Sequence, residues 1–350
     1  MKLKLWVKVL LAILLVGVGY IGYQMLFNNE PTSIVNKEEN FSEIVKFVKN
    51  NGIYDEKYEE EYKNIKYNEK PIFKEVLSVF LDKGYKGEEI NYIMELSDKN
   101  INKLKNTDYI DISNYYTFKN FNVDNISRYN KYKESHEEYE YKNIVTYVNI
   151  KLDLPVYTDT VEVKEPDSLL VLVNKYNSLP KNYKPTNLVA MKGYYEGQDP
   201  SLREETKSAL EDLQKASKEE IGIRLLPTTA FRDYNFQNTL YTNYKNKDGV
   251  EAADTYSARP GYSDHQTGLA VDLKNPERSN VRLSDSDYEW LHNNAYKYGF
   301  IIRFPKGKEF ITGYQFENWH IRYVGKDVAK IIYENDLTLE EYIDLYVTEY

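Results

Sequence analysis

An uncharged apolar run near the beginning of the chain most constrains what the rest can become. Residues 9–27 (VLLAILLVGVGYIGYQMLF) carry no charge and follow Lys2, Lys4 and Lys8. A helix of this length spans roughly 28 Å, close to the hydrocarbon thickness of a bilayer. We therefore expect an N-terminal transmembrane anchor over residues 1–27, with a cleaved signal peptide as the alternative. Because the basic flank stays cytoplasmic, both interpretations place the remaining chain outside the membrane.

Composition limits the chemistry of the exported part. The chain has no cysteine, which excludes disulfides, a thiolate nucleophile, cysteine-type zinc fingers and iron–sulfur clusters. Its net charge of -9 argues against a nucleic-acid partner, which would require a basic surface. An imidazole metal site has only four histidines to draw on, namely His136, His265, His292 and His320.

Residues 28–143 read as a polar linker followed by a small helical region. One apolar stripe runs through Ile72, Val76 and Phe80, between a helix-starting Pro71 and Gly84 at the expected helix end. No sequence period recurs clearly enough to predict a solenoid. This region is expected to space or orient the domain on its carboxyl-terminal side.

Residues 144–350 mix strand-like and helical segments without regular βαβ spacing, which predicts an α+β domain. Capping patterns predict helices beginning near Ser201-x-x-Glu204, Ser284 and Thr338-x-x-Glu341. The segments that read as strands are residues 144–150, 223–226, 269–273, 300–304 and 319–324.

The first segment with chemical potential is Ser263–Asp272 (SDHQTGLAVD). Strand alternation places the Asp272 carboxylate on the face opposite the apolar residues, and Gly268 lets the chain turn so that His265 approaches it. Imidazole and carboxylate together suit Zn²⁺. Taken alone, a single His–Asp pair at this spacing belongs to a surface loop more often than to a metal site.

The second segment, Glu317-Asn-Trp-His320, offers a third ligand and a nearby acid. Three protein ligands with an open fourth position are typical of catalytic zinc, and a carboxylate beside them can relay protons. The rival Glu289-x-x-His292 lies in an apparently regular helix without a second histidine. His292 is therefore expected to be structural or on the surface, and a thermolysin-type helix is excluded.

Together these motifs resemble the VanY-type D-alanyl-D-alanine carboxypeptidases, zinc peptidases of peptidoglycan that share a fold with the Hedgehog signalling domain. Residues 229–237 (TAFRDYNFQ), 299–305 (GFIIRFP), 312–314 and 320–325 (HIRYVG) are similar to other parts of that family's pattern. The similarity covers roughly residues 145–350. It implies a Hedgehog/DD-peptidase-like zinc domain over residues 144–350, with a central antiparallel sheet flanked by helices.

The resemblance also implies roles for individual residues. From the residues alone, the favoured interpretations are a surface ion pair for Arg232 and a solvated helix position for Gln237. The implied site consists of His265, Asp272 and His320 as Zn²⁺ ligands, Glu317 as catalytic base, Arg232 as the oxyanion-stabilising cation, and Ser263 and Gln237 as substrate contacts.

Two positions depart from the family pattern. Phe304 stands where relatives commonly carry tyrosine, so a hydroxyl contact is missing there unless Tyr314 replaces it. Asn318 replaces a frequent proline and is expected to affect mainly backbone stiffness. Neither change removes an implied ligand or the base.

The sequence therefore predicts a single-pass protein of a bacterial cell membrane whose zinc carboxypeptidase domain faces the cell wall. Its expected reaction removes the C-terminal D-alanine from peptidoglycan stem peptides. The alternatives are an L,D-carboxypeptidase or a peptidoglycan endopeptidase of the same fold, or a cell-wall-binding module without catalysis.

Overall fold

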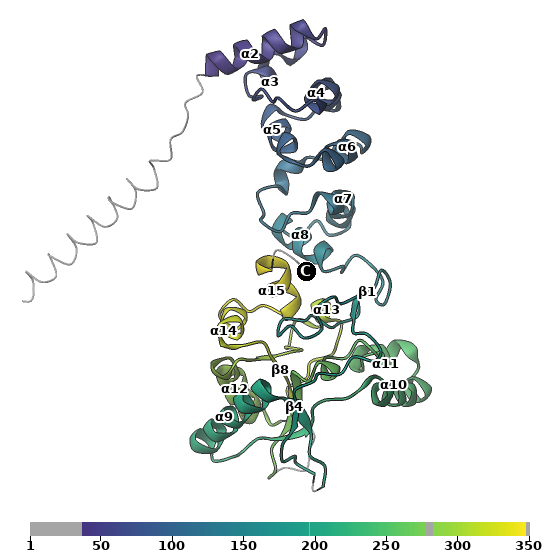
Figure 1. Cartoon of the computed structure of the whole chain (residues 1–350), viewed down its shortest axis with the longest axis vertical. Coiled ribbons are helices and arrows are strands. Elements are labelled where there is room, and N and C mark those ends of the chain that lie inside the picture. Colours follow the sequence, from purple (N-terminus) through teal and green to yellow (C-terminus); the bar gives the residue numbers. More distant parts are fainter. Residues whose placement is uncertain (1–36, 196, 278–282, 348–350) are drawn as a thin grey trace, which may run out of the picture. The chain divides into compact units, whose positions relative to one another are not determined.

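The computed structural model describes residues 37–195, 197–277 and 283–347, and the chain divides into two compact units, residues 1–116 and 117–350 (Figure 1). The expected anchor at residues 9–27 lies outside the described residues. Within them, no helix has the length and apolar character needed to cross a membrane. The boundary expected at residue 143 falls inside the second unit.

The first unit is helical. Its apolar stripe is buried as expected, and the helix that carries it ends at Gly84, whose φ of 99° is readily adopted by glycine. From residue 37 onward, the α-helices of this unit are α2 (Lys37–Asn50), α3 (Glu59–Tyr62), α4 (Ile72–Lys83), α5 (Gly87–Glu95) and α6 (Asp98–Asn106).

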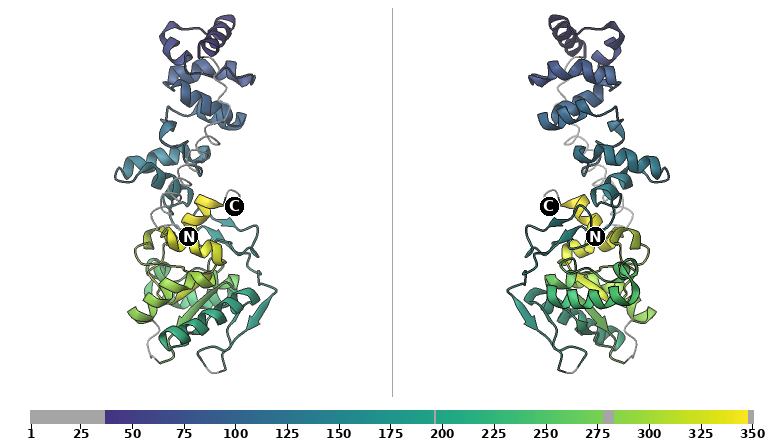
Figure 2. Two further views of the ribbon diagram at one scale, coloured as in Figure 1. Left: turned by 90° about the vertical axis from the view of Figure 1, so that its left-hand side faces the viewer. Right: turned by 90° about the vertical axis from the view of Figure 1, so that its right-hand side faces the viewer.

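The helices of the first unit stack in successive layers (Figure 2), and two asparagine side chains bind the segment between α3 and α4. Asn40 Nδ2 donates to Ile65 O at 2.7 Å, and Asn91 Nδ2 donates to Asn64 O at 2.8 Å, so the linked residues are 25 and 27 positions apart. Both asparagines therefore bind the same connecting segment, residues 64–65, and hold it against α2 and α5.

The second unit begins with α7 (Ile126–Ser135) and α8 (Tyr141–Asn149). The strand predicted at residues 144–150 is wrong, since this segment forms most of α8. Its β-branched residues favour a strand locally. Ile144, Val145 and Val148 are nevertheless spaced to share one helix face, and all three are fully buried. Packing of α8 against α7 and α15 (Leu339–Tyr346) outweighs the local preference.

A four-stranded antiparallel sheet forms the centre of the second unit, as expected from the family pattern. Its order is β5 (Leu226–Thr229), β6 (Ala270–Lys274), β8 (His320–Tyr323) and β7 (Phe300–Ile302). Val271 and Leu273 of β6 pack with Leu210 and Leu213 of α9 (Glu204–Ile221). Figure 1 shows α9 and α12 (Asp285–Asn294) to one side of the strands, and α10 (Tyr234–Asp248) and α11 (Val250–Tyr256) to the other.

The capping predictions had mixed outcomes. Ser284 and Thr338 cap α12 and α15 as expected. The prediction at Ser201 is wrong, because residues 201–203 form β4 (Ser201–Arg203), which pairs with β3 (Leu188–Ala190), and α9 starts only at Glu204. Cross-strand hydrogen bonds therefore take the place of the expected cap. The remaining elements are β1 (Val161–Glu162), β2 (Asn177–Ser178), α13 (Glu309–Thr312) and α14 (Lys326–Glu334).

Candidate metal centre

The two central strands bring a carboxylate and an imidazole together. Asp272 and His320 are direct partners in the antiparallel register of β6 and β8, so their side chains share one face of the sheet. Asp272 Oδ1 lies 3.1 Å from His320 Nδ1. Val271 and Leu273 turn to the opposite face, where they join the core. Strand alternation therefore separates the polar face from the core, as predicted.

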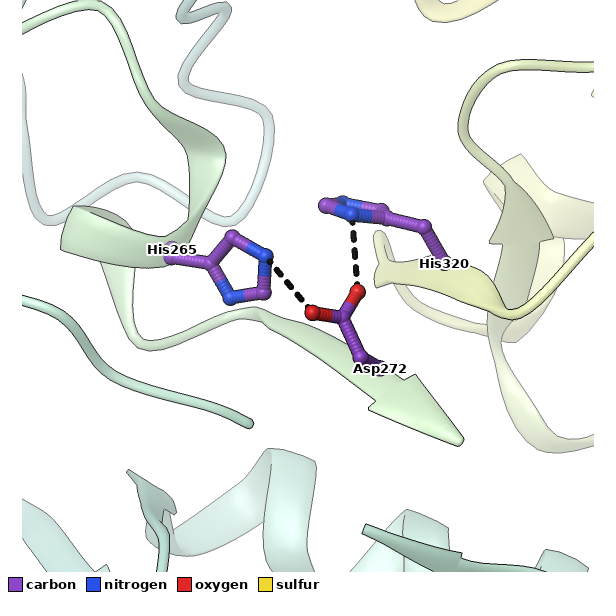
Figure 3. A group of neighbouring side chains, drawn as sticks. All are labelled: His265, Asp272 and His320. Atoms are coloured by element: carbon purple, nitrogen blue, oxygen red, sulfur yellow. Dashed lines mark ion pairs between the residues drawn. The ribbon is translucent and has the colours of Figure 1, made fainter. Parts of the chain in front are cut away.

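His265 reaches the same point from a short 3-10 turn at residues 264–267 (Figure 3). The turn ends at Gly268, where φ is 69° and a Cβ atom would lie only 2.9 Å from Leu188 Cδ2. The ring Nδ1 lies 2.7 Å from Ala230 O and donates to it. This hydrogen bond leaves Nε2 facing the site, 3.4 Å from Asp272 Oδ2.

This group has the geometry of a metal site. His265, Asp272 and His320 each offer one ligand atom, and these atoms all lie within 4.8 Å of one another. Among the described residues, the buried Asp272 Oδ1 accepts no hydrogen bond of acceptable geometry. A bound cation would satisfy this oxygen. Two imidazoles and one carboxylate are a donor set that suits zinc.

The electrostatics of the group also favour a cation. Burial and then the nearby Arg232 lower the pKa of His265 to about 4, so this ring stays neutral and able to act as a ligand. Burial alone would lower the pKa of His320, but the carboxylates of Asp272 and Glu317 raise it to about 9. The same two carboxylates that stabilise a proton here would stabilise a metal ion.

A cavity of about 400 Å³ opens over this group. Glu317 lines it, with Oε2 3.4 Å from His320 Nδ1, and its backbone N–H donates to Phe304 O at 3.1 Å. Ser263 and Arg232 also line the cavity, together with an aromatic wall. The aromatic residues in this wall are Tyr244, Tyr256, Tyr262, Phe304, Tyr314, Phe316 and Trp319.

Arg232 faces the metal group, with Nη1 3.7 Å from Asp272 Oδ2. Its Nε donates to Gln237 Oε1 at 3.1 Å, and Gln237 Nε2 donates to Ala258 O at 2.8 Å. Gln237 thus lies behind Arg232 and outside the cavity lining, where its amide orients the guanidinium. Its position favours an indirect role over the substrate contact that the sequence implied.

The structure shows what Phe304 and Asn318, the two departures from the family pattern, contact. The Phe304 ring packs 5.0 Å from the His320 ring and 4.8 Å from the Tyr314 ring, measured between centroids. Tyr314 Oη lies 3.3 Å from Tyr157 Oη, so this hydroxyl already has a partner. Asn318 pairs with both the backbone N–H and the carbonyl of Leu283, which fixes the chain beside Glu317.

Sequence reasoning missed a buried charge network directly beside the metal group. Asp264 Oδ2 accepts from Arg303 Nε and Oδ1 accepts from Arg322 Nη1, both at 2.6 Å. Arg303 also binds Glu340 of α15 at 2.7 and 2.9 Å. Asp264 adjoins His265 in sequence, and Arg303 N donates to His320 O at 3.2 Å. An arginine inside the apolar segment FIIRF was the available signal for this network.

Comparison with known proteins places this domain in context. Residues 199–326 match the VanY family, described as D-alanyl-D-alanine carboxypeptidase. YodJ of Bacillus subtilis is 42% identical over 190 residues, which cover 52% of this chain and 69% of YodJ. A D-alanyl-D-alanine carboxypeptidase of Enterococcus faecalis is 34% identical over 190 residues, covering 51% of this chain and 67% of the enzyme.

A solved structure of the L,D-carboxypeptidase LdcB, described in connection with peptidoglycan recognition, is also similar. It is 40% identical to this chain with a TM-score of 0.50, and the match covers 54% of this chain and 91% of LdcB.

Proposed function

The chain belongs to the VanY family of D-alanyl-D-alanine carboxypeptidases, and we propose that it is a zinc enzyme that removes the C-terminal D-alanine from peptidoglycan stem peptides. The observation that carries the proposal is the convergence of His265, Asp272 and His320 at one cavity, with Glu317 beside them. In this proposal the first three residues bind Zn²⁺. The chemistry that a bound zinc ion supplies is polarisation of a carbonyl and a lower pKa for water.

Glu317 is the proposed catalytic base. Its carboxylate lies at the metal group and lines the cavity, so it can accept a proton from the attacking water and return it to the leaving amine. Its Oε2 lies 3.4 Å from Nδ1 of His320, a proposed metal ligand, which supports this role. The Glu317 backbone bond to Phe304 helps to fix this position.

Arg232 is the proposed cation for the developing oxyanion. A guanidinium keeps its charge when buried and offers several donors in a planar arrangement, which suits a carboxylate or an oxyanion. Asp272 and Gln237 hold it from two directions. Ser263, buried at the cavity wall two residues before His265, is the proposed contact for the substrate terminus.

The purified full chain, loaded with zinc, should release D-alanine from a muramyl pentapeptide. Mass spectrometry of the products detects this release. Glu317→Gln should abolish release while metal analysis still finds zinc bound. Glu334→Gln, the same change at an exposed site on α14, should leave release intact. A zinc-replete protein that hydrolyses no stem-peptide terminus, yet binds cell wall independently of Glu317, would show a binding module and refute the proposal.

The same assay addresses the configuration of the penultimate residue. The enterococcal relative is a D,D-enzyme by its name, whereas the similar LdcB structure is of an L,D-carboxypeptidase. Release from a pentapeptide ending in D-Ala-D-Ala supports our proposal. Release only from a tetrapeptide, whose single D-alanine follows an L-centre, would assign L,D specificity, and cleavage of cross-linked dimers would assign an endopeptidase.

The proposed location is a bacterial cell membrane with the catalytic domain facing the wall, and this part rests on the sequence of residues 9–27. Fractionation tests it directly. The full chain should sediment with membranes and resist carbonate extraction, whereas a variant lacking residues 1–27 should not.

A further inference from the structure

A second cavity in the carboxyl-terminal unit has a composition unlike that of the metal centre. It measures about 760 Å³, within the range of ligand-binding clefts, and lies between the end of α8, the turn at residues 174–177 and the end of α15. Six asparagines contribute to its lining. These are Asn120, Asn122, Asn125, Asn149, Asn174 and Asn177.

The amides are held in place by one another and by a carboxylate. Asn120 Nδ2 donates to Asp344 Oδ2 at 2.5 Å, and Asn149 Nδ2 donates to Asp344 Oδ1 at 2.8 Å. On the other side, Asn174 Oδ1 accepts from Asn177 Nδ2 at 3.1 Å. Asn120 Nδ2 also donates to Thr146 Oγ1 at 3.1 Å, so the orientation of this amide is fixed and its Oδ1 is the atom that it offers to a ligand.

The cavity lining carries two lysines, Lys119 and Lys151, and two carboxylates, Glu340 and Asp344, so its formal charges balance. Glu340 is buried and bound to Arg303, and Lys151 pairs with Asp159 at 2.8 Å. Asp344 holds two amide donors, and burial raises its pKa to about 6, so it is largely ionised at neutral pH. A lining without net charge offers no excess of either sign to a charged ligand, whereas neutral hydroxyl and acetamido groups match the amides.

An aromatic ring completes the lining. Tyr346 is 51% exposed, and its ring stacks on Tyr342 with centroids 5.1 Å apart. The ring is thus held from behind by Tyr342 while half of its surface meets solvent. An exposed ring beside neutral polar groups suits a ligand that has both an apolar face and hydroxyls, such as a pyranose.

We propose that this cavity binds N-acetylated amino sugars of the glycan strand. The idea rests on the proposed function, because stem peptides are attached to a glycan of such sugars, and a second site would keep the enzyme on the strand. Tyr346 would stack on the sugar face, and the amides at Asn177 and Asn120 would bind hydroxyl and acetamido groups.

The test is calorimetric titration of the full chain with tetra-N-acetylglucosamine, an uncharged probe without peptide. We expect measurable binding that persists after chelation of metal, and roughly tenfold weaker binding for Tyr346→Ala and Asn177→Ala. Tyr195→Ala is the matched control, because Tyr195 is 45% exposed and lies outside this cavity. Thermal melting by circular dichroism verifies that each variant is folded.

Hydrogen exchange locates the sugar, which should slow exchange at residues 119–125 and 339–347. Absence of binding at millimolar probe, or equal binding of wild type and both cavity variants, would overturn the proposal. Equal affinity for cellotetraose, which lacks acetamido groups, would overturn the assigned sugar class. Sugar binding without peptide hydrolysis would refute only the proposed function, and hydrolysis without sugar binding would refute only this inference.

Discussion

Asp264→Asn tests whether the buried charge network supports the carboxyl-terminal unit. The wild-type carboxylate sits between Arg303 and Arg322 at 2.6 Å from each, and all three side chains are almost completely excluded from solvent. Burial raises the pKa of Asp264, but the guanidiniums of Arg322 and Arg303 outweigh this effect and hold the pKa below its ordinary value. The carboxylate is therefore ionised and neutralises the cations.

Asparagine keeps the shape of the side chain but removes this charge. Arg303 retains Glu340, whereas Arg322 loses the carboxylate of Asp264 and retains hydrogen bonds to backbone carbonyls, including those of Leu169 and Val171. Removing one partner from a buried ion pair destabilises a protein by about 3–5 kcal/mol. We expect the free energy of unfolding of the carboxyl-terminal unit to fall by this amount.

Urea unfolding followed by tryptophan fluorescence measures the effect, because Trp290 and Trp319 both lie in this unit. The matched control is Glu334→Gln, another removal of a carboxylate. Its partner Lys330 is 3.8 Å away, and the two side chains are 61% and 55% exposed, so a loss of about 0.5 kcal/mol or less is expected. If Asp264→Asn lay within about 1 kcal/mol of wild type, the stabilising role of the network would be refuted.

Three further predictions concern the metal, a buried lysine and the orientation of Arg232. Zinc at about 100 times its Kd should stabilise chelator-treated protein by about 2.7 kcal/mol in thermal melts; His265→Ala should remove this effect and His292→Ala should not. Burial lowers the pKa of Lys175 to about 8, so the unfolded chain binds more protons between pH 8 and 10.5 and stability rises with pH there. In denaturant titrations, the free energy of unfolding of wild type relative to that of Lys175→Met should rise by on the order of 3 kcal/mol across that pH window. A difference between the two proteins that does not change with pH would contradict this. Gln237→Ala should lower kcat/KM by roughly tenfold or more because Arg232 loses an acceptor, with zinc content unchanged; an unaltered kcat/KM would rule out the orienting role.

Sequence reasoning predicted those parts of the site that depend on local periodicity. Alternation along residues 269–273 separated Asp272 from the core face, and Gly268 indicated the turn after His265. It could not supply the pairing of Asp272 with His320, because strand register depends on contacts between segments far apart in the chain.

The buried charge network that the sequence did not reveal and the strand that was wrongly predicted have the same origin. Asp264 looks like a loop residue until β7 and β8 bring Arg303 and Arg322 to it, from 39 and 58 positions away. The β-branched run of α8 favours a strand until α7 and α15 cover it. In each case a tertiary partner, absent from the local sequence, decides the outcome.

The cavity at the metal centre is built from two kinds of structure, which can vary separately. Asp272 and His320 come from the two inner strands of the sheet, where every neighbour limits change. Much of the aromatic wall comes from elsewhere, with Tyr244 and Tyr256 on α10 and α11 and Phe316 on the segment before β8. Substitutions in that wall can therefore reshape the cavity while the candidate donor atoms for a metal stay in place.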